Sequence, residues 1–151
     1  MSPAVGGVPG NILAFDYGLK RIGVAVGERA TGSSSPLGSV RVTRRGPDWD
    51  TIGRLLDEWR PVLALVGVPR LPDGGEGSFA PAARAFARAL GERFGVAVET
   101  ADETLTSREA RELLREQRRS GVRTRRLRQG DVDPVAAVLI LRGWLASREH
   151  A

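Results

Sequence analysis

The sequence predicts an α/β fold: a mixed five-stranded sheet, in which an antiparallel meander is followed by parallel strands, with helices on both faces. Two apolar runs near the start, 12–18 and 21–27, are separated by a short polar turn and predict a hairpin. The later run VLALVGV (62–68) has no polar alternation, which is typical of a parallel strand covered on both faces. Helical periodicity separates the later strands and predicts right-handed crossover connections.

A third strand completes the meander and is followed by the first helix. LGSVRV (37–42) is this strand, after the turn-rich stretch TGSSSP. Asp48 or Asp50 can cap a helix that Pro61 ends. Apolar residues recur through this helix at helical spacing, at Ile52, Leu55, Leu56 and Trp59.

The next part of the chain carries one more helix and the fifth strand. Residues 69–78 are rich in proline and glycine and form a loop. Apolar positions in 79–94 mark one face of a helix, and VAVET (96–100) is a short strand.

Two further helices are expected before the C-terminus. TSRE (106–109) has the form of a capping box, which opens a helix through about residue 118. Residues 120–130 are polar, basic and punctuated by glycine, so we expect a mobile loop. Asp133 and Pro134 predict the start of a core helix, with Asp133 as its cap and Pro134 in the first helical position.

Composition places the chain among globular proteins and narrows its chemistry. Its 151 residues, 41% of them hydrophobic, suffice for one domain, expected over 12–148 after a flexible N-terminal tail at 1–11. No apolar run reaches the length of a membrane span, and the first residues do not have the form of a signal peptide. With no cysteine and a single histidine, His150, catalysis must rest on carboxylates, hydroxyls or cations.

The basic residues are concentrated in one segment. The net charge is +5, and Lys20 is the only lysine. Between residues 108 and 128 arginine far outnumbers glutamate, which indicates a polyanionic partner such as nucleic acid. A solvated helix surface is the alternative explanation. The arginines are Arg108, Arg111, Arg115, Arg118, Arg119, Arg123, Arg125, Arg126 and Arg128.

Acidic residues follow the ends of the predicted strands, where ligands of open α/β sheets collect. Asp16 ends the first strand, Glu103 follows the fifth, and Asp133 opens the last helix. Carboxylates brought together repel each other unless a cation neutralises them, and Mg²⁺ prefers such all-oxygen clusters. Two such ions can activate a water and stabilise the leaving oxygen of a phosphodiester.

Each acid also has a simpler explanation. Asp16 could form an Asx-turn with the hairpin. Glu103 could be a surface residue of a loop. Periodicity alone favours Asp133 as an ordinary helix cap, although a capping carboxylate still has a second oxygen to offer a metal.

Four motifs in order resemble the YqgF-type family of Holliday junction resolvases, also described as pre-16S rRNA nucleases. DYGLKRIGVAVG resembles the first motif of this family and LVGVPRLPDGGEG the second. DETLTSREA is similar to the third, and DVDPVAAVLILRGWL to the last. The resemblance covers residues 11–146.

The resemblance implies a ribonuclease H-like fold and a metal-dependent endonuclease that requires Mg²⁺ or Mn²⁺. It also implies a cytoplasmic bacterial protein that acts on structured nucleic acid, in maturing the 5′ end of 16S rRNA. Asp16, Glu103 and Asp133 fall on the acidic triad of the family, as catalytic residues and metal ligands.

Two groups of cations are expected to bind nucleic acid. Lys20 and Arg21 lie in the turn beside Asp16, where they would face incoming phosphates; a turn made soluble by charge is the alternative. The second group is Arg123, Arg125 and Arg126.

The chain also departs from the family pattern. Thr104 stands where the third motif commonly has arginine, which removes a phosphate contact. The second motif usually has an asparagine in its loop, and this chain has Arg70, Leu71 and Pro72 there.

Two alternative functions remain open. The substrate could be a four-way DNA junction in recombination and repair, because the same chemistry cleaves RNA and DNA. The protein could instead be a non-catalytic nucleic-acid-binding transcription factor, whose binding would survive loss of the acids. The sequence leaves the oligomeric state open between monomer and homodimer.

Overall fold

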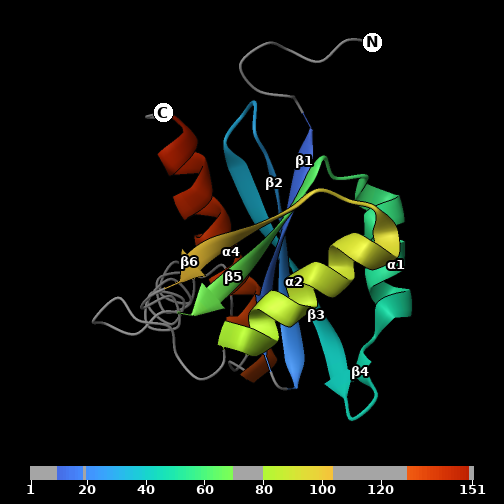
Figure 1. Ribbon diagram of the computed structural model, residues 1–151. Coiled ribbons are helices and arrows are strands. Elements are labelled where there is room, and N and C mark those ends of the chain that lie inside the picture. The colour runs from blue at the N-terminus through green and yellow to red at the C-terminus, as the bar shows by residue number, and fades with distance from the viewer. Residues whose placement is uncertain (1–9, 19, 70–79, 104–128, 150–151) are drawn as a thin grey trace.

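The computed structural model describes residues 10–18, 20–69, 80–103 and 129–149. A six-stranded sheet lies between α1 and α2 on one face and α4 on the other (Figure 1). The strands are β1 (Asn11–Tyr17), β2 (Arg21–Glu28), β3 (Ser33–Thr43), β4 (Gly46–Pro47), β5 (Leu63–Pro69) and β6 (Val98–Glu103). The helices are α1 (Trp49–Trp59), α2 (Ala80–Phe94) and α4 (Gln129–Glu149).

The strand order is β4-β3-β2-β1-β5-β6, which confirms the predicted mixed sheet. β1, β2 and β3 form the antiparallel meander, while β5 pairs in parallel with both β1 and β6. The C-terminal ends of β1, β5 and β6 therefore share one edge of the sheet, which we call the carboxyl edge. The turn between β1 and β2 and the hairpin between β3 and β4 lie at this same edge (Figure 1).

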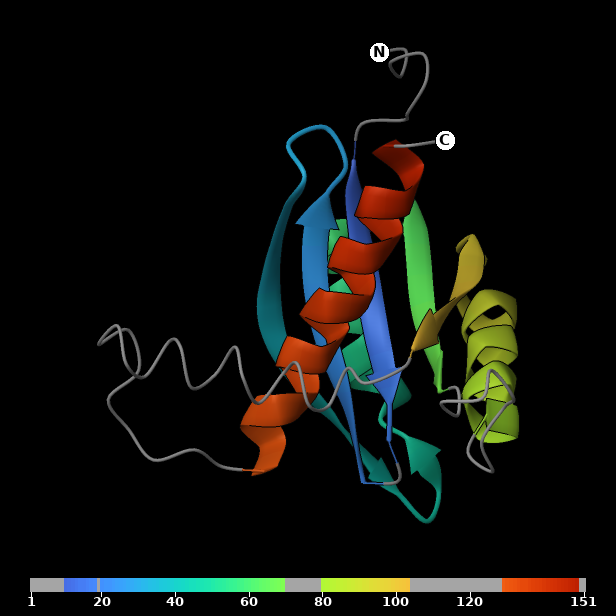
Figure 2. The same ribbon diagram turned by 90° about the vertical axis from the view of Figure 1, so that its left-hand side faces the viewer.

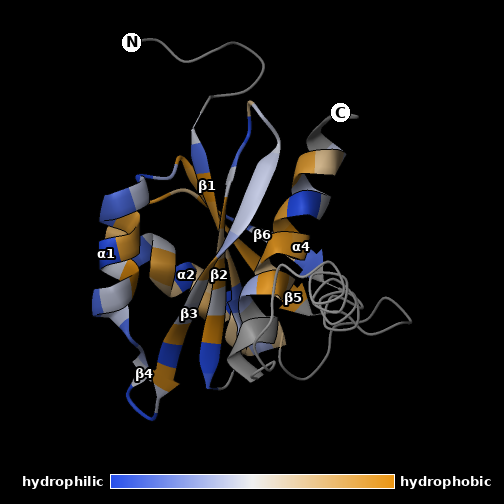
Figure 3. Ribbon diagram, turned by 180° about the vertical axis from the view of Figure 1, so that it is seen from behind, coloured by the Kyte–Doolittle hydropathy of each residue, from blue (hydrophilic) through white to orange (hydrophobic). Residues whose placement is uncertain are grey.

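Alternation along β1 divides the core into two layers. Leu13 and Phe15 are fully buried in the cluster that α1 and α2 cover. Ile12 and Ala14 are buried in the cluster beneath α4. Figure 3 shows apolar residues gathered on these strands and on the inner side of the helices, with polar residues on the outer side of α1. None of the described helices is long and apolar enough to cross a bilayer.

Helix α1 confirms one predicted cap. Asp48 is the N-cap: its Oδ1 accepts from the Thr51 backbone N–H at 3.2 Å, and its Oδ2 accepts from the Thr51 hydroxyl at 2.7 Å. The helix ends at Trp59, and Arg60 follows in the left-handed region with φ of 44°. Pro61 then comes directly after the cap, as predicted.

Two strands differ from their predicted bounds by more than one residue at an end, and one strand was not predicted. β3 begins at Ser33 because the serines of the expected turn pair with β2, with a register shift opposite Val24 and Ala25. β4 is a two-residue pairing of Gly46 and Pro47 with β3, too short to produce a periodic pattern. It is the sixth strand of a sheet predicted to have five. β6 starts and ends later than predicted, so Glu103 is its last residue and not part of a loop.

The prediction that Asp133 caps the last helix is wrong. α4 begins at Gln129, so Asp133 is its fifth residue and Pro134 lies inside it. A proline inside a helix removes its own N–H and crowds the carbonyl four residues earlier, here that of Gly130, but it does not prevent the preceding turn from being helical. At the other end of the chain, Asn11 is the first residue of β1 and not the last of a tail. Residues 1–9 of the expected tail (1–11), the expected helix at 106–118 and most of the expected basic loop (120–130) lie outside the described residues.

Candidate active site

Asp16 lies one residue before the end of β1, at the carboxyl edge. It is half-buried and pairs with Gly23 of β2. Its position alternates with Phe15 and Tyr17, so it shares the α4 face of the sheet with Ile12 and Ala14. Because β1 is flanked by β2 and β5, the backbone of Asp16 is held by a central strand.

The turn after Asp16 depends on Gly18. A Cβ at this position would lie 2.5 Å from the carbonyl oxygen of Arg21, so only glycine allows the backbone to approach this closely. Lys20 is exposed, and Arg21 is the half-buried first residue of β2. The Lys20 carbonyl accepts a hydrogen bond from the Val42 N–H at 2.9 Å, which ties the turn to β3.

Glu103 ends β6 at the same edge as Asp16. In the parallel ladder Phe15 is opposite Val66, and Gly67 is opposite Ala101. The backbone of Glu103 therefore lies two residues further along the strand direction than the level of Asp16. The side chain of Glu103 is outside the described set.

Asp133 belongs to the first part of α4, which runs across the sheet with its N-terminal end toward the carboxyl edge (Figure 2). Leu141 touches the sheet at Gly27, where a Cβ would lie 2.5 Å from Leu141 Cδ2. Position 133 is eight residues back from Leu141, about 12 Å along a helix. Gly23, which pairs with Asp16, lies four residues before Gly27 along β2, a distance of about 13 Å.

Two contacts far from this edge fix α4 on the sheet. Trp144 Nε1 donates to Glu99 Oε1 of β6 at 3.1 Å. The Arg29 guanidinium lies 5.8 Å from the centre of the Trp144 ring. α4 is thus attached to β6 and to the residue that follows β2, on either side of β1.

Other predicted site residues lie outside the described residues: Arg123, Arg125 and Arg126, Thr104, and the loop residues Arg70, Leu71 and Pro72. Among the side chains that the structure does describe, no group of three acids, histidines or cysteines could hold a metal ion. Only Asp16 of the predicted triad belongs to that set.

Sequence reasoning assigned no role to three arginines at the same edge. Arg41 lies near the end of β3, directly opposite Arg21 in the ladder, and Arg44 and Arg45 form the turn that follows β3. The signal in the sequence is the run TRRG, two arginines directly after an alternating strand.

A family model described as "Holliday junction resolvase", RuvX, matches residues 10–147. Two relatives, from Aeromonas hydrophila and Escherichia coli, are both named as candidate pre-16S rRNA nucleases. The first is 45% identical over 89% of this chain and 94% of the relative. The second is 46% identical over 89% of this chain and 95% of the relative.

Solved structures with the same fold include two resolvases. Thermus thermophilus RuvC, in complex with a Holliday junction substrate, has a TM-score of 0.54 at 16% identity and covers 93% of this chain and 96% of its own. The yeast mitochondrial Holliday junction resolvase Ydc2 has a TM-score of 0.54 at 13% identity, covering 92% and 80%. At these identities the likeness concerns the fold, and it agrees with the ribonuclease H-like fold expected from the sequence.

Proposed function

The chain belongs to the RuvX family of nucleases, and from this premise we propose that it is a metal-dependent endonuclease that cleaves structured nucleic acid. Its task would be maturation of the 5′ end of the 16S rRNA precursor. The observation that carries the proposal is the 45% identity, over 89% of the chain, to relatives named for that RNA. Residues 12–148 would act as a single nuclease domain in the cytoplasm, where ribosomal RNA is made in bacteria.

The donor chemistry at the carboxyl edge fits a hard divalent cation. Nucleases of this kind generally use such ions, which activate a water and stabilise the leaving oxygen. The sequence contains no cysteine and only one histidine, so sulfur and imidazole ligands are almost absent and a metal site must be built from the oxygen atoms of acids. Oxygen-only sites are those that Mg²⁺ and Mn²⁺ prefer. Asp16, Glu103 and Asp133 would hold the ion.

Backbone positions support this choice of three acids. Position 103 belongs to the same alternating set as Glu99 and Ala101, which contact α4 or the cluster beneath it. Position 133 lies one turn before Ala137 and two turns before Leu141, on the stripe of α4 that packs against the sheet. Asp16 belongs to the same face, so all three positions border one layer of the molecule.

The residues of the chain itself would bind and orient the substrate. Asp16 is presented by a central strand, and rigid placement matters because a misplacement of about 1 Å can cost ~10²-fold in rate. Lys20 and Arg21, in the adjoining turn, would bind the phosphates beside the scissile bond. Arg123, Arg125 and Arg126 would add charge contacts further along the nucleic acid.

A four-way DNA junction is the second candidate substrate. The family description and the resolvase structures favour it, although those structures share at most 16% identity with this chain. Side-by-side cleavage of a 16S rRNA precursor and a synthetic four-way junction separates the two. We expect faster cleavage of the RNA; faster cleavage of the junction would assign the chain to recombination.

Asp16→Asn tests whether the protein is an enzyme at all. Removing one negative charge from the ligand set should abolish cleavage, whereas nucleic-acid affinity and the circular dichroism spectrum should stay near wild type. Asp57→Asn, on the exposed surface of α1, is the matched control and should remain active. A fully active Asp16→Asn protein would overturn the mechanism. No cleavage by wild type, with intact binding, would favour the transcription-factor alternative.

A further inference from the structure

The carboxyl edge carries positive charge well beyond the turn beside Asp16. Arg41 is exposed and lies directly opposite Arg21 in the β2–β3 ladder, where like charges disfavour pairing. Arg44 and Arg45 follow on the exposed hairpin between β3 and β4. We call Lys20, Arg21, Arg41, Arg44 and Arg45 the basic ledge.

The ledge is held in place by backbone contacts. The Val42 N–H donates to the Lys20 carbonyl at 2.9 Å, and the Asp48 N–H donates to the Arg41 carbonyl at 3.0 Å. The Thr43 hydroxyl accepts from the Arg45 N–H at 3.2 Å, which orders the hairpin turn. These bonds join the three segments that carry the five cations.

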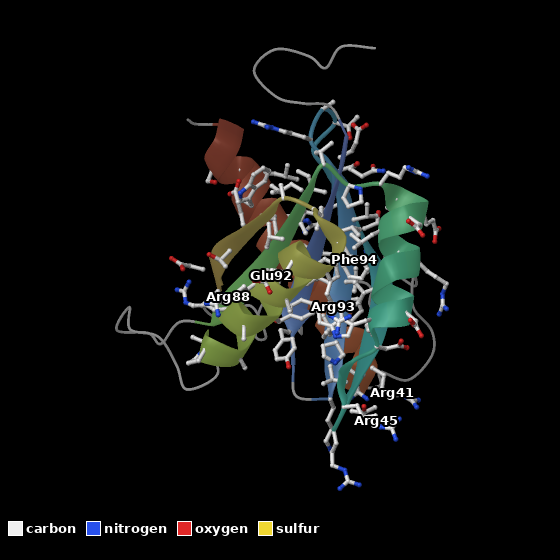
Figure 4. The ribbon with its side chains drawn as sticks, turned by 45° about the vertical axis from the view of Figure 1, so that its right-hand side comes forward. Arg41, Arg45, Arg88, Glu92, Arg93 and Phe94 are labelled. Carbon is white, nitrogen blue, oxygen red and sulfur yellow. The ribbon has the colours of Figure 1, made fainter. Side chains whose placement is uncertain are left out.

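A surface cavity of about 410 Å³ opens beside Arg41 and Arg45, at one end of the ledge. Arg41, Thr43 and Arg45 line it together with Asp48, Trp49 and Asp50. Figure 4 labels Arg41 and Arg45, whose side chains lie at the end of the β3–β4 hairpin. Two acids, Asp48 and Asp50, share the cavity with Arg41 and Arg45, and the five cations of the ledge outnumber these two carboxylates, so the set keeps a net positive charge.

The aromatic residues near the ledge are occupied elsewhere. Trp49 is stacked on Phe86 with ring centres 5.6 Å apart, and the Arg93 guanidinium lies 4.5 Å from the centre of the Trp49 ring. Tyr17 is stacked on the same Phe86 at 5.0 Å. Proteins that bind single strands use free aromatic faces on which bases stack. The five residues of the ledge offer charge but no such face, which suits a duplex backbone.

We propose that the basic ledge binds the phosphate backbone of a duplex flank of the substrate, on the β3 side of Asp16. This proposal rests on the proposed nuclease function and names the part of the substrate that this side of the site recognises. From β1 to β3 the sheet spans two strand spacings, about 10 Å. That distance covers about three base-pair steps at ~3.4 Å each, so the ledge reaches several phosphates beyond the scissile bond.

The test replaces Arg41 and Arg45 by glutamine and measures binding to short RNA and DNA duplexes as a function of salt. Each lost phosphate contact lowers the slope of log K against log salt by about 0.9 for B-form DNA, so the double variant should lose about 1.8. A single strand of equal length should lose less than half as much. The RNA and DNA arms decide which duplex the ledge prefers.

The matched control is Arg60→Gln with Arg142→Gln, which removes two exposed cations, one after the C-terminal end of α1 and one on α4, away from the ledge. This pair should change the slope by less than 0.5, a margin roughly half of one phosphate contact. Equal slopes for wild type and the ledge variant, or equal losses for duplex and single strand, would overturn the proposal.

Cleavage separates this proposal from the nuclease function. At saturating substrate the ledge variant should keep kcat within about two-fold, since it loses binding and not the acids. If wild type cleaves no substrate, the affinity for duplexes and its salt slope still decide whether the ledge binds duplexes. If wild type cleaves and the salt slopes of wild type and the ledge variant are equal, the nuclease function stands and only the proposal that the ledge binds duplexes is wrong.

Discussion

The carboxylate of Asp48 accepts hydrogen bonds from the hydroxyl and the backbone N–H of Thr51, and these bonds lower the pKa of Asp48 below its ordinary value of 3.8. A pKa that folding lowers means that the ionised form favours the native state. The contribution of Asp48 is therefore fully present above pH 3.8 and is lost as the pH falls through the lower folded pKa.

Asp48→Asn tests this charge while keeping the cap. Asparagine caps helices about as well as aspartate but does not titrate in this range. We expect urea midpoints in which wild type exceeds the variant by a constant amount from pH 7 to 5, and in which this difference shrinks below pH 3.8. The other carboxylates titrate in both proteins and cancel in the comparison. A difference that is constant down to pH 2.5 would show that the hydrogen bonds, and not the charge, distinguish the two proteins.

At the scale of elements, the position of α4 depends on Gly27 of β2. A Cβ at Gly27 would meet Leu141 Cδ2 at 2.5 Å and the Ser33 carbonyl oxygen at 2.8 Å. Gly27→Ala should therefore lower the free energy of unfolding by about 1–3 kcal/mol, the usual cost of overpacking. Chemical denaturation of the variant and of wild type measures this loss.

Two further variants show whether the loss comes from the contact of β2 with α4. Combining Gly27→Ala with Leu141→Ala should cost less than the sum of the two single changes, because the truncated side chain makes room for the new methyl group. Gly143→Ala, in the same helix with open space around its Cβ, should instead gain up to ~1 kcal/mol from helix propensity. Additive losses in the double variant would place the strain at Ser33 and not at the helix.

Most elements could be predicted because their apolar spacing reflects burial. The hairpin of β1 and β2 and the buried β5 follow directly from that spacing. The cap of α1 was narrowed to Asp48 or Asp50 by the capping preference of aspartate, and Asp48 is the N-cap. The predicted bounds of β6 were too early because β6 is an edge strand. Its C-terminal end is polar, with Asp102 exposed, and pairs with β5 without showing an apolar pattern. The predicted last helix was shorter than α4 because proline is favoured at the start of a helix but does not have to stand there.

At the scale of the whole molecule, the candidate site draws on segments distant in sequence. The position of Asp16 at the carboxyl edge could be predicted from its own surroundings, since a buried strand ends there beside a tight turn. The position of Asp133 relative to the sheet could not be predicted in this way, because it depends on how α4 crosses the sheet, which local spacing does not encode. The contacts of Trp144 with Glu99 and of Leu141 at Gly27 set that crossing.

A metal shared by the sheet and α4 would connect the two layers, and this predicts metal-dependent stability. A ligand that binds only the native state, at 100 times its dissociation constant, stabilises it by about 2.7 kcal/mol. For a chain of this size that raises the melting temperature by roughly 5–10 °C. Wild type should show this rise between EDTA and excess Mg²⁺ or Mn²⁺ in scanning calorimetry.

Asp133→Asn should lose most of this rise, together with cleavage, because asparagine cannot supply the ligand charge. In EDTA its free energy of unfolding should be within about 1 kcal/mol of that of wild type, since α4 begins four residues earlier and needs no cap at this position. Asp131→Asn is the matched control: it removes the same charge from the same turn and should keep both the rise and the activity. If Asp131→Asn instead loses them while Asp133→Asn keeps them, Asp131 is the ligand that α4 contributes.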